Sequence, residues 1–301
     1  MKVLFLGSSQ FSAVVLKKML DEGVNVVGVI TQPDRPCGRG HKLTPNNAKV
    51  LAMANDIPCY CYDRMRNHQE EIENIDYDVS VVASFGQILP QWFLDYKLCI
   101  NVHPSLLPKY RGASPIQNAI LNGDEKTGVT IMKVAMEVDS GDIILQREFV
   151  LNGEYYLELE NKLAFIGGGM VKEVLDSIEN GTVTFTPQAH DKAVHVQKFV
   201  KEDGLLNFNQ NAKSLECRVR ALSETIGCYF IIGGDALKVV KAKAIDEAGQ
   251  IGVVSSNKKR FIIGCNGGSL EIEMCKAPSG KTIRGQDYLN GHNEILGEKV
   301  N

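Results

Sequence analysis

Short apolar runs alternate with amphipathic stretches through the first half of the chain. Residues 3–6 form an apolar run closed by Gly7, and residues 11–22 then place apolar side chains at helical spacing. Gly23 ends that helix, and residues 24–30 form a second apolar run. Further strands are predicted at 79–83, 98–100, 127–134 and 143–150, and further helices after an N-cap at Thr44, over 115–121 and over 157–180. This alternation predicts an α/β fold with a Rossmann-like, mostly parallel sheet and flanking helices.

The pattern changes in the second half of the chain. Periodicity fades over residues 188–206, where charged residues cluster, and this segment is predicted to be a linker. An amphipathic helix is predicted over 212–222, and short strands bounded by Gly and Asn follow at 229–232, 237–240, 252–255, 261–264 and 270–274. We therefore predict a first domain of residues 1–187 and a smaller C-terminal OB-like β-barrel domain of residues 207–301.

The composition limits the class of protein. The 301 residues are about twice the length of a typical domain of roughly 150 residues. A formal net charge of −3 argues against a strongly basic nucleic-acid coat and against a disordered polyelectrolyte. The eight cysteines include no C-x-x-C pair, and neither a signal-peptide core nor an apolar run of ~18 residues occurs. We therefore expect a soluble, cytoplasmic protein with reduced thiols and no metal site.

The turn after the first predicted strand is a weak candidate for phosphate binding. Residues 7–12 open a helix at the edge where open α/β sheets bind ligands. They lack the G-x-G-x-x-G spacing, and the chain has no Walker A sequence. An ordinary strand-to-helix turn is the simpler interpretation, so a dinucleotide-dependent enzyme is not favoured.

Asn101 and His103 lie at the end of a predicted strand that Pro104 stops. Residues two apart point to the same side of a strand, so the amide and the imidazole should project together. This pair suits acyl transfer, in which donors stabilise negative charge on a carbonyl oxygen. A histidine at a strand end is also a common structural residue, so the pair needs a third polar group.

A turn rich in carboxylates could supply that group. A carboxylate beside the imidazole would orient the ring and favour its protonated form. The turn contains Glu137, Asp139 and Asp142, and spacing alone does not choose among them. Aspartates in turns are also frequent turn formers.

Residues 31–43 form a long segment punctuated by Gly and Pro. Loops longer than ~12 residues within a compact domain are uncommon and often functional. This one contains Arg35, Arg39 and Lys42, which could contact a phosphate backbone. A solvated surface loop is the alternative.

Residues 101–112, NVHPSLLPKYRG, resemble the hallmark of the folate-dependent formyltransferases, which use 10-formyltetrahydrofolate. The turn at 139–142 lies where that family has its catalytic aspartate. Other segments also resemble this family, namely 32–40, 186–188, 201–204, 277–281 and 288–291, so the resemblance covers nearly the whole chain. One departure is that residues 222–227 replace the aromatic–proline pair usual in the second domain.

The resemblance implies a role for each matching residue. Asn101, His103 and Asp139 would be the catalytic trio. The folate pocket would be lined by Ser105, Leu106, Leu107, Pro108, Phe85, Gly86, Gln87, Ile88 and Leu89. Arg39, together with Arg35 and Lys42, would contact the acceptor-stem region of a tRNA.

The resemblance also implies a reaction. The formyl group of 10-formyltetrahydrofolate, a co-substrate, would pass to the amino group of initiator methionyl-tRNA for translation initiation. The protein would act as a monomer, with no metal and no membrane partner. The C-terminal domain would support the tRNA, and residues 207–301 are modestly basic, with 13 Lys and Arg against 10 Asp and Glu.

Other functions remain open at this point. A formyltransferase acting on a sugar-nucleotide amine, or a 10-formyltetrahydrofolate hydrolase, would keep Asn101, His103 and Asp139 but would not need the basic loop. A non-catalytic RNA-binding protein would explain the loop but not the polar pair.

Overall fold

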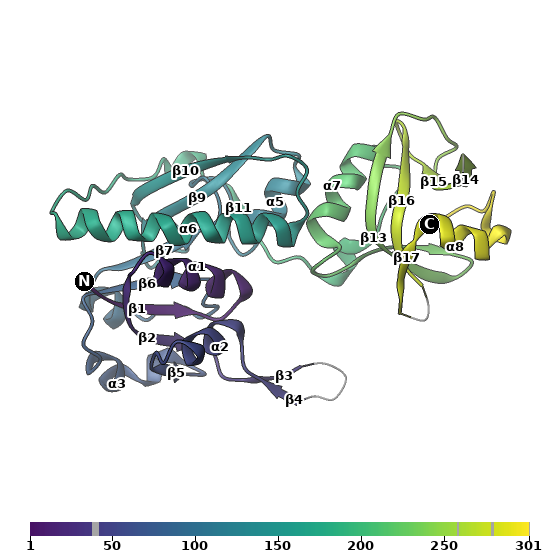
Figure 1. Ribbon diagram of the computed structural model, residues 1–301. Helices are drawn as coiled ribbons and strands as arrows, with labels where there is room; N and C mark the ends of the chain where they lie inside the picture. Colours follow the sequence, from purple (N-terminus) through teal and green to yellow (C-terminus); the bar gives the residue numbers. More distant parts are fainter. Residues whose placement is uncertain (38–41, 258, 278–279, 301) are drawn as a thin grey trace. The chain divides into compact units, whose positions relative to one another are not determined.

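The computed structural model describes residues 1–37, 42–257, 259–277 and 280–300, without the side chain of Cys37. The chain divides into two compact units (Figure 1). The first comprises Met1–Gly112, Lys126–Val150 and Glu160–His195, and the second comprises Ala113–Glu125, Leu151–Leu159 and Val196–Asn301. Each unit is therefore assembled from several segments of the chain.

A seven-stranded sheet forms the centre of the first unit, with the strand order β10-β9-β7-β6-β1-β2-β5. The parallel strands are β1 (Lys2–Gly7), β2 (Asn25–Thr31), β5 (Cys59–Cys61), β6 (Val79–Ala83) and β7 (Cys99–His103). β9 (Lys126–Lys133) pairs antiparallel with both β7 and β10 (Ile143–Val150). The mostly parallel, Rossmann-like sheet predicted from the sequence is confirmed.

Burial explains the continuous apolar runs in the central strands. Every residue of β6 is buried, and in β1 only Lys2 is exposed. Strands covered on both faces need apolar side chains at successive positions. The helices of this unit are α1 (Gln10–Asp21), α2 (Asn47–Ala54), α3 (Gln69–Glu73), α4 (Gln91–Tyr96) and most of α6 (Tyr156–Glu179).

Helix α6 packs closely because glycines face its neighbours. A Cβ atom on Gly167 would lie 2.5 Å from the Val102 side chain on β7. A Cβ atom on Gly168 would lie 2.8 Å from the carbonyl oxygen of Val15 on α1. These close approaches hold α6 against the sheet and against α1.

The predicted start of α2 is wrong. Asn46 caps this helix, because its side-chain oxygen accepts the Lys49 N–H at 3.1 Å while its Nδ2 donates to the Gln32 carbonyl at 2.8 Å. Thr44 lies instead in β4 (Lys42–Thr44), which pairs antiparallel with β3 (Arg35–Cys37). Part of the expected loop at 31–43 is therefore a two-stranded hairpin.

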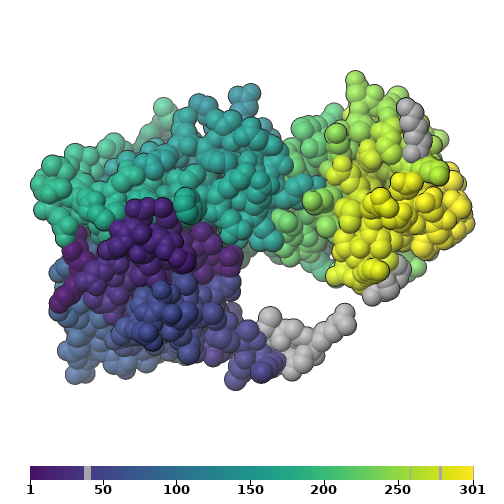
Figure 2. All heavy atoms as spheres, in the orientation of Figure 1, coloured from purple at the N-terminus to yellow at the C-terminus, as the bar shows by residue number. Residues whose placement is uncertain are grey.

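The second unit is built on an antiparallel sheet with the order β12-β13-β16-β15-β14. Its strands are β12 (Cys228–Ile232), β13 (Asp235–Ile245), β14 (Val254–Asn257), β15 (Arg260–Gly264) and β16 (Ser269–Lys276), with β17 (Thr282–Arg284) beside β16. Its helices include α5 (Pro115–Leu121), α7 (Ala212–Leu222) and α8 (Gly285–Gly291). The C-terminal residues, in yellow, lie together on the surface of this unit (Figure 2).

The separate C-terminal β domain is as predicted, but the closed barrel is not. Within the described ranges, the four-residue β14 pairs with β15 and no ladder joins β12 to β14. The sheet is therefore open. No helix in the described part of the chain is long and apolar enough to cross a membrane.

Candidate active site

Asn101 and His103 lie on β7, and both side chains approach the carboxylate of Asp139. Asn101 Nδ2 lies 3.5 Å from Asp139 Oδ1, and His103 Nδ1 lies 3.6 Å from Asp139 Oδ2. His103 is 4% exposed, while Asn101 is half-buried. The structure thus brings the amide and the imidazole together around one carboxylate at the carboxyl end of β7.

The surroundings of His103 fix its orientation. Its Nε2 lies 3.0 Å from the carbonyl oxygen of Tyr110. A carbonyl oxygen only accepts, so Nε2 bears a hydrogen and Nδ1 is the nitrogen that faces Asp139. In the neutral ring, the Nδ1 lone pair would face a carboxylate, whereas the imidazolium gives each nitrogen an acceptor.

Asp139 occupies a special backbone position. Its φ of +52° lies in the left-handed region that few non-glycine residues adopt. The Gly112 N–H donates to Asp139 Oδ2 at 2.8 Å, which holds the carboxylate toward His103. Of the other carboxylates considered, Glu137 has a side chain 66% exposed, and Asp142 accepts the Lys133 N–H through its backbone at 2.9 Å.

Cys99, at the start of β7, is not a candidate nucleophile. Burial raises the pKa of its thiol to about 12. The thiol is therefore protonated near neutral pH, and its reactive thiolate form is scarce.

The run Ser105–Pro108 is partly enclosed. Ser105 and Leu107 are buried, and Leu106 and Pro108 are half-buried. Ser105 Oγ donates to the Lys109 carbonyl at 2.6 Å, so its hydroxyl is used within the loop. Leu106 and Pro108 are therefore the members of this run with the most surface free for a ligand.

The run Phe85–Leu89 also contains both buried and exposed side chains. Phe85 and Leu89 are buried, whereas Ile88 is 86% exposed. Gln87 accepts the Met65 N–H at 2.9 Å and donates to the Tyr62 carbonyl at 2.7 Å. Gln87 thus anchors the loop, and Ile88 offers apolar surface.

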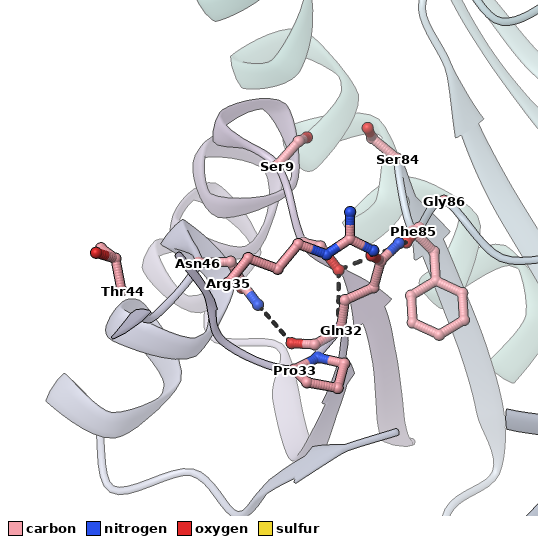
Figure 3. A pocket seen from close by; sticks show the side chains of 10 residues that line it. Ser9, Gln32, Pro33, Arg35, Thr44, Asn46, Ser84, Phe85 and Gly86 are labelled. Atoms are coloured by element: carbon pink, nitrogen blue, oxygen red, sulfur yellow. Dashed lines mark hydrogen bonds between the residues drawn. The ribbon is translucent and has the colours of Figure 1, made fainter. Parts of the chain in front are cut away.

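An open pocket of about 290 Å³ lies beside this loop (Figure 3). It is lined by Ser8, Ser9, Gln32, Pro33, Arg35, Thr44, Asn46, Ser84, Phe85 and Gly86. These residues come after β1, β2 and β6. In the sheet, β2 and β5 lie on one side of β1, and β6 and the later strands lie on the other side, so the order of strands switches between β1 and β6. Ligands of open α/β sheets bind at such a point.

The pocket brings two predicted sets of residues together. Phe85 and Gly86 come from the predicted folate set, and Arg35 comes from the predicted tRNA set. The Arg35 guanidinium donates to Gln32 Oε1, and Gln32 Nε2 donates to the Phe85 carbonyl at 2.9 Å (Figure 3). Sequence reasoning missed Gln32 in this role.

The predicted tRNA-binding residues of the basic segment 31–43 are Arg35, Arg39 and Lys42. Arg35 on β3 and Lys42 on β4 are exposed, and Lys42 is the ladder partner of Cys37. Arg39 lies outside the described residues.

Comparison with known proteins assigns the family. Residues 1–175 match the formyl transferase family, and residues 198–293 match the formyl transferase C-terminal domain. The chain belongs to the formyl transferase family. The matched residues 1–175 include Asn101, His103 and Asp139.

Individual proteins similar to this chain are also formyltransferases. The chain is 37% identical to the methionyl-tRNA formyltransferase of Sulfurihydrogenibium sp., over 99% of each chain. It is also 37% identical to the methionyl-tRNA formyltransferase of Thermotoga neapolitana, over 97% of this chain and 95% of the relative. An N-formyltransferase from Helicobacter canadensis, solved with folinic acid and dTDP-3-aminofucose, shares the fold at a TM-score of 0.69 and 19% identity, covering 90% and 98% of the two chains.

Sequence reasoning missed two further buried polar residues near this candidate site. Arg111 is 1% exposed, and Gln188 is 5% exposed although it begins the segment predicted as a linker. Arg111 belongs to the 101–112 motif, which could have drawn attention to it. Gln188 lies in a segment without periodicity, and nothing local in the sequence marks it as buried. Among the described residues, no group of three or more His, Cys, Asp or Glu side chains could hold a metal ion.

Proposed function

We propose that this enzyme transfers the formyl group of 10-formyltetrahydrofolate to the free α-amino group of initiator methionyl-tRNA, giving N-formylmethionyl-tRNA. The observation that supports this acceptor best is the similarity to methionyl-tRNA formyltransferases over nearly the whole length of both chains. The Helicobacter canadensis protein was solved with folinic acid, a folate, which is in keeping with a folate donor.

Asn101 and His103 would stabilise the charge that develops during the reaction. The neutral amine attacks the formyl carbon, and the carbonyl electron pair moves onto oxygen. Asn101 Nδ2 is only loosely held by Asp139, at 3.5 Å, so it is free to donate to that oxyanion. His103 Nδ1–H is the second donor, because Nε2 is engaged by Tyr110. Long contacts of this kind commonly tighten when substrate binds.

Asp139 would keep His103 charged and accept the proton that the amine loses. As the tetrahedral adduct breaks down, the oxyanion pair re-forms the carbonyl and the bond between the formyl carbon and N10 of the folate is cleaved. N10 keeps the electron pair of that bond and takes up the proton that Asp139 received, which returns Asp139 to its carboxylate form. The enzyme forms no covalent bond to the formyl group, since the donor is already activated and the main task is to position the reactants.

Binding of the two substrates would involve both predicted sets. Leu106, Pro108 and Ile88 offer surface for the folate, within the pocket set of Ser105–Pro108 and Phe85–Leu89. Arg35, Arg39 and Lys42 would contact tRNA phosphates, and the pocket bordered by Arg35 would admit the acceptor end.

We further propose a domain organisation and a setting. Residues 1–187 would form the catalytic domain, 188–206 a linker whose first residues pack within the first unit, and 207–301 the tRNA-supporting domain. The protein would act as a cytoplasmic monomer. Formyl transfer from 10-formyltetrahydrofolate to charged initiator tRNA, followed by acid-gel separation of formylated and unformylated tRNA, tests the proposed reaction.

A further inference from the structure

Arg111 is a buried cation whose ion pair within the described part of the chain is long. Burying a charge is costly unless it is well paired, yet Arg111 is 1% exposed. The nearest carboxylate oxygen is Glu137 Oε1, 3.9 Å from Nη1, on a side chain that is 66% exposed. The closer partners are Gln188 Oε1, at 3.1 Å from Nε and 2.7 Å from Nη2, and His190 Nδ1, at 3.2 Å from Nη2.

The guanidinium fixes the orientation of Gln188. A guanidinium only donates, so the side-chain oxygen of Gln188 must face it and the NH₂ group must face away. That NH₂ group donates to the carbonyl of Asp139 at 2.9 Å and to the carbonyl of Gly141 at 2.7 Å. Gln188 therefore binds the backbone on both sides of Ser140, inside the carboxylate turn.

The same part of the chain also holds the Asp139 carboxylate. The Arg111 N–H donates to the Val194 carbonyl at 2.8 Å, which anchors the backbone at Arg111. The next N–H, of Gly112, donates to Asp139 Oδ2. Asp139 is thus held through its backbone by Gln188 and through its carboxylate by Gly112, with Arg111 common to both connections.

We propose that Gln188 and Arg111 are positioning residues that hold the Asp139 carboxylate against His103. Asp139 needs such support because its positive φ is unfavourable for a residue with a side chain. The effect on turnover rests on the proposed function, whereas the effect on the position of Asp139 does not.

The test is Gln188→Glu, compared with Gln188→Ala. Glutamate keeps an acceptor for Arg111 but removes both donors and places an oxygen against the two carbonyls. Amide hydrogen exchange followed by NMR then reports on two neighbouring groups. The Gly112 amide depends on the Asp139 carboxylate, whereas the Arg111 amide depends on the Val194 carbonyl.

In both variants, we expect Gly112 to exchange at least about 10-fold faster while Arg111 keeps its protection. We also expect kcat to fall by about 10- to 100-fold, with KM for donor and acceptor within about twofold, since a small displacement of a catalytic group lowers turnover. Gln146→Glu is the matched control. Gln146 Nε2 donates to the Leu107 carbonyl at 2.8 Å and to Thr130 Oγ1 at 2.9 Å, away from the turn, so the Gly112 and Arg111 amides should both keep their wild-type exchange rates.

Two results would overturn the positioning role. One is an unchanged Gly112 exchange rate with unchanged kcat. The other is equal loss of protection at Gly112 and Arg111, which would mean that Gln188 only stabilises the fold. A wild-type enzyme that fails to formylate methionyl-tRNA would count against the proposed function alone, since the amide comparison would still report on Asp139.

Discussion

His103 and Asp139 face each other across the site, with Nδ1 3.6 Å from Oδ2, while the other ring nitrogen is engaged by the Tyr110 carbonyl. The two ring nitrogens therefore differ: Nε2 is fixed by the Tyr110 carbonyl, and Nδ1 faces the carboxylate. The Asn101 amide approaches the same carboxylate as His103 Nδ1.

Asn101→Ala removes one of the two proposed oxyanion donors. Losing such a donor typically lowers kcat by about 10² to 10³, and we expect a loss in that range. His103→Ala should lower kcat at least as much, because it removes both the second donor and its charge. Steady-state kinetics of formyl transfer measure both losses, and turnover close to wild type in either variant would contradict the assigned roles.

Asp139→Asn keeps the shape of the side chain but removes its charge. Without the carboxylate, His103 lacks a charged acceptor at Nδ1 and the amine lacks its proton acceptor, so kcat should fall by about 10²-fold or more. Asp142→Asn is the control, since the same charge is lost from the same turn without contact to His103. Equal kcat losses in the two variants would show that the general charge of the turn, rather than Asp139, is responsible.

The basic segment of residues 31–43 should contribute a salt-dependent part of tRNA affinity. Replacing Arg35 or Arg39 by Ala should weaken tRNA binding and reduce the slope of log affinity against log salt by about 1 for each phosphate that the side chain neutralises. Lys17→Ala removes a charge that pairs with Asp21 within α1 and serves as the control. Fluorescence anisotropy over a salt series measures these slopes, and an affinity equal to wild type in both arginine variants would exclude the two arginines from tRNA binding.

Two adjacent glycines of α6 should respond oppositely to alanine. A Cβ on Gly168 would lie 2.6 Å from Lys18 Cβ and 2.8 Å from the Val15 carbonyl, so Gly168→Ala should destabilise the protein by about 1–3 kcal/mol. At Gly169 the nearest atom would be Lys18 Cε at 3.6 Å, so Gly169→Ala should stabilise it by about 0.5–1 kcal/mol. Urea denaturation gives both values, and a shift in the same direction for both variants would mean that α6 packs differently from the structure.

Local sequence determined much of the fold. Helix α7, predicted over 212–222 from its apolar spacing, has the bounds Ala212–Leu222, and in the structure Asn211 caps it. Strand β5 (Cys59–Cys61) and helix α4 (Gln91–Tyr96) were not predicted, because three and six residues are too short to show a period. The start of α2 depended on whether Thr44 or Asn46 caps the helix, and the Asn46 cap is also held by a hydrogen bond to the distant Gln32 carbonyl.

From the local pattern alone, the candidate site was predictable only where two residues share a strand, and Asp139 followed from the family resemblance. The common direction of Asn101 and His103 follows from the alternation of side chains along β7. The selection of Asp139 over Glu137 or Asp142 depends on a positive φ and on the Gly112 N–H, which no local pattern in the turn reveals. Gln188 is buried through hydrogen bonds to distant segments, so its burial leaves no periodic trace in the sequence.

Acceptor choice by the wild-type enzyme tests the central claim most directly. With 10-formyltetrahydrofolate as donor, we expect kcat/KM for initiator methionyl-tRNA to exceed that for an amino-sugar nucleotide by at least about 100-fold. We also expect no release of formate when both acceptors are omitted. Equal or faster transfer to the amino sugar, or formate release without an acceptor, would contradict the assignment of methionyl-tRNA as substrate.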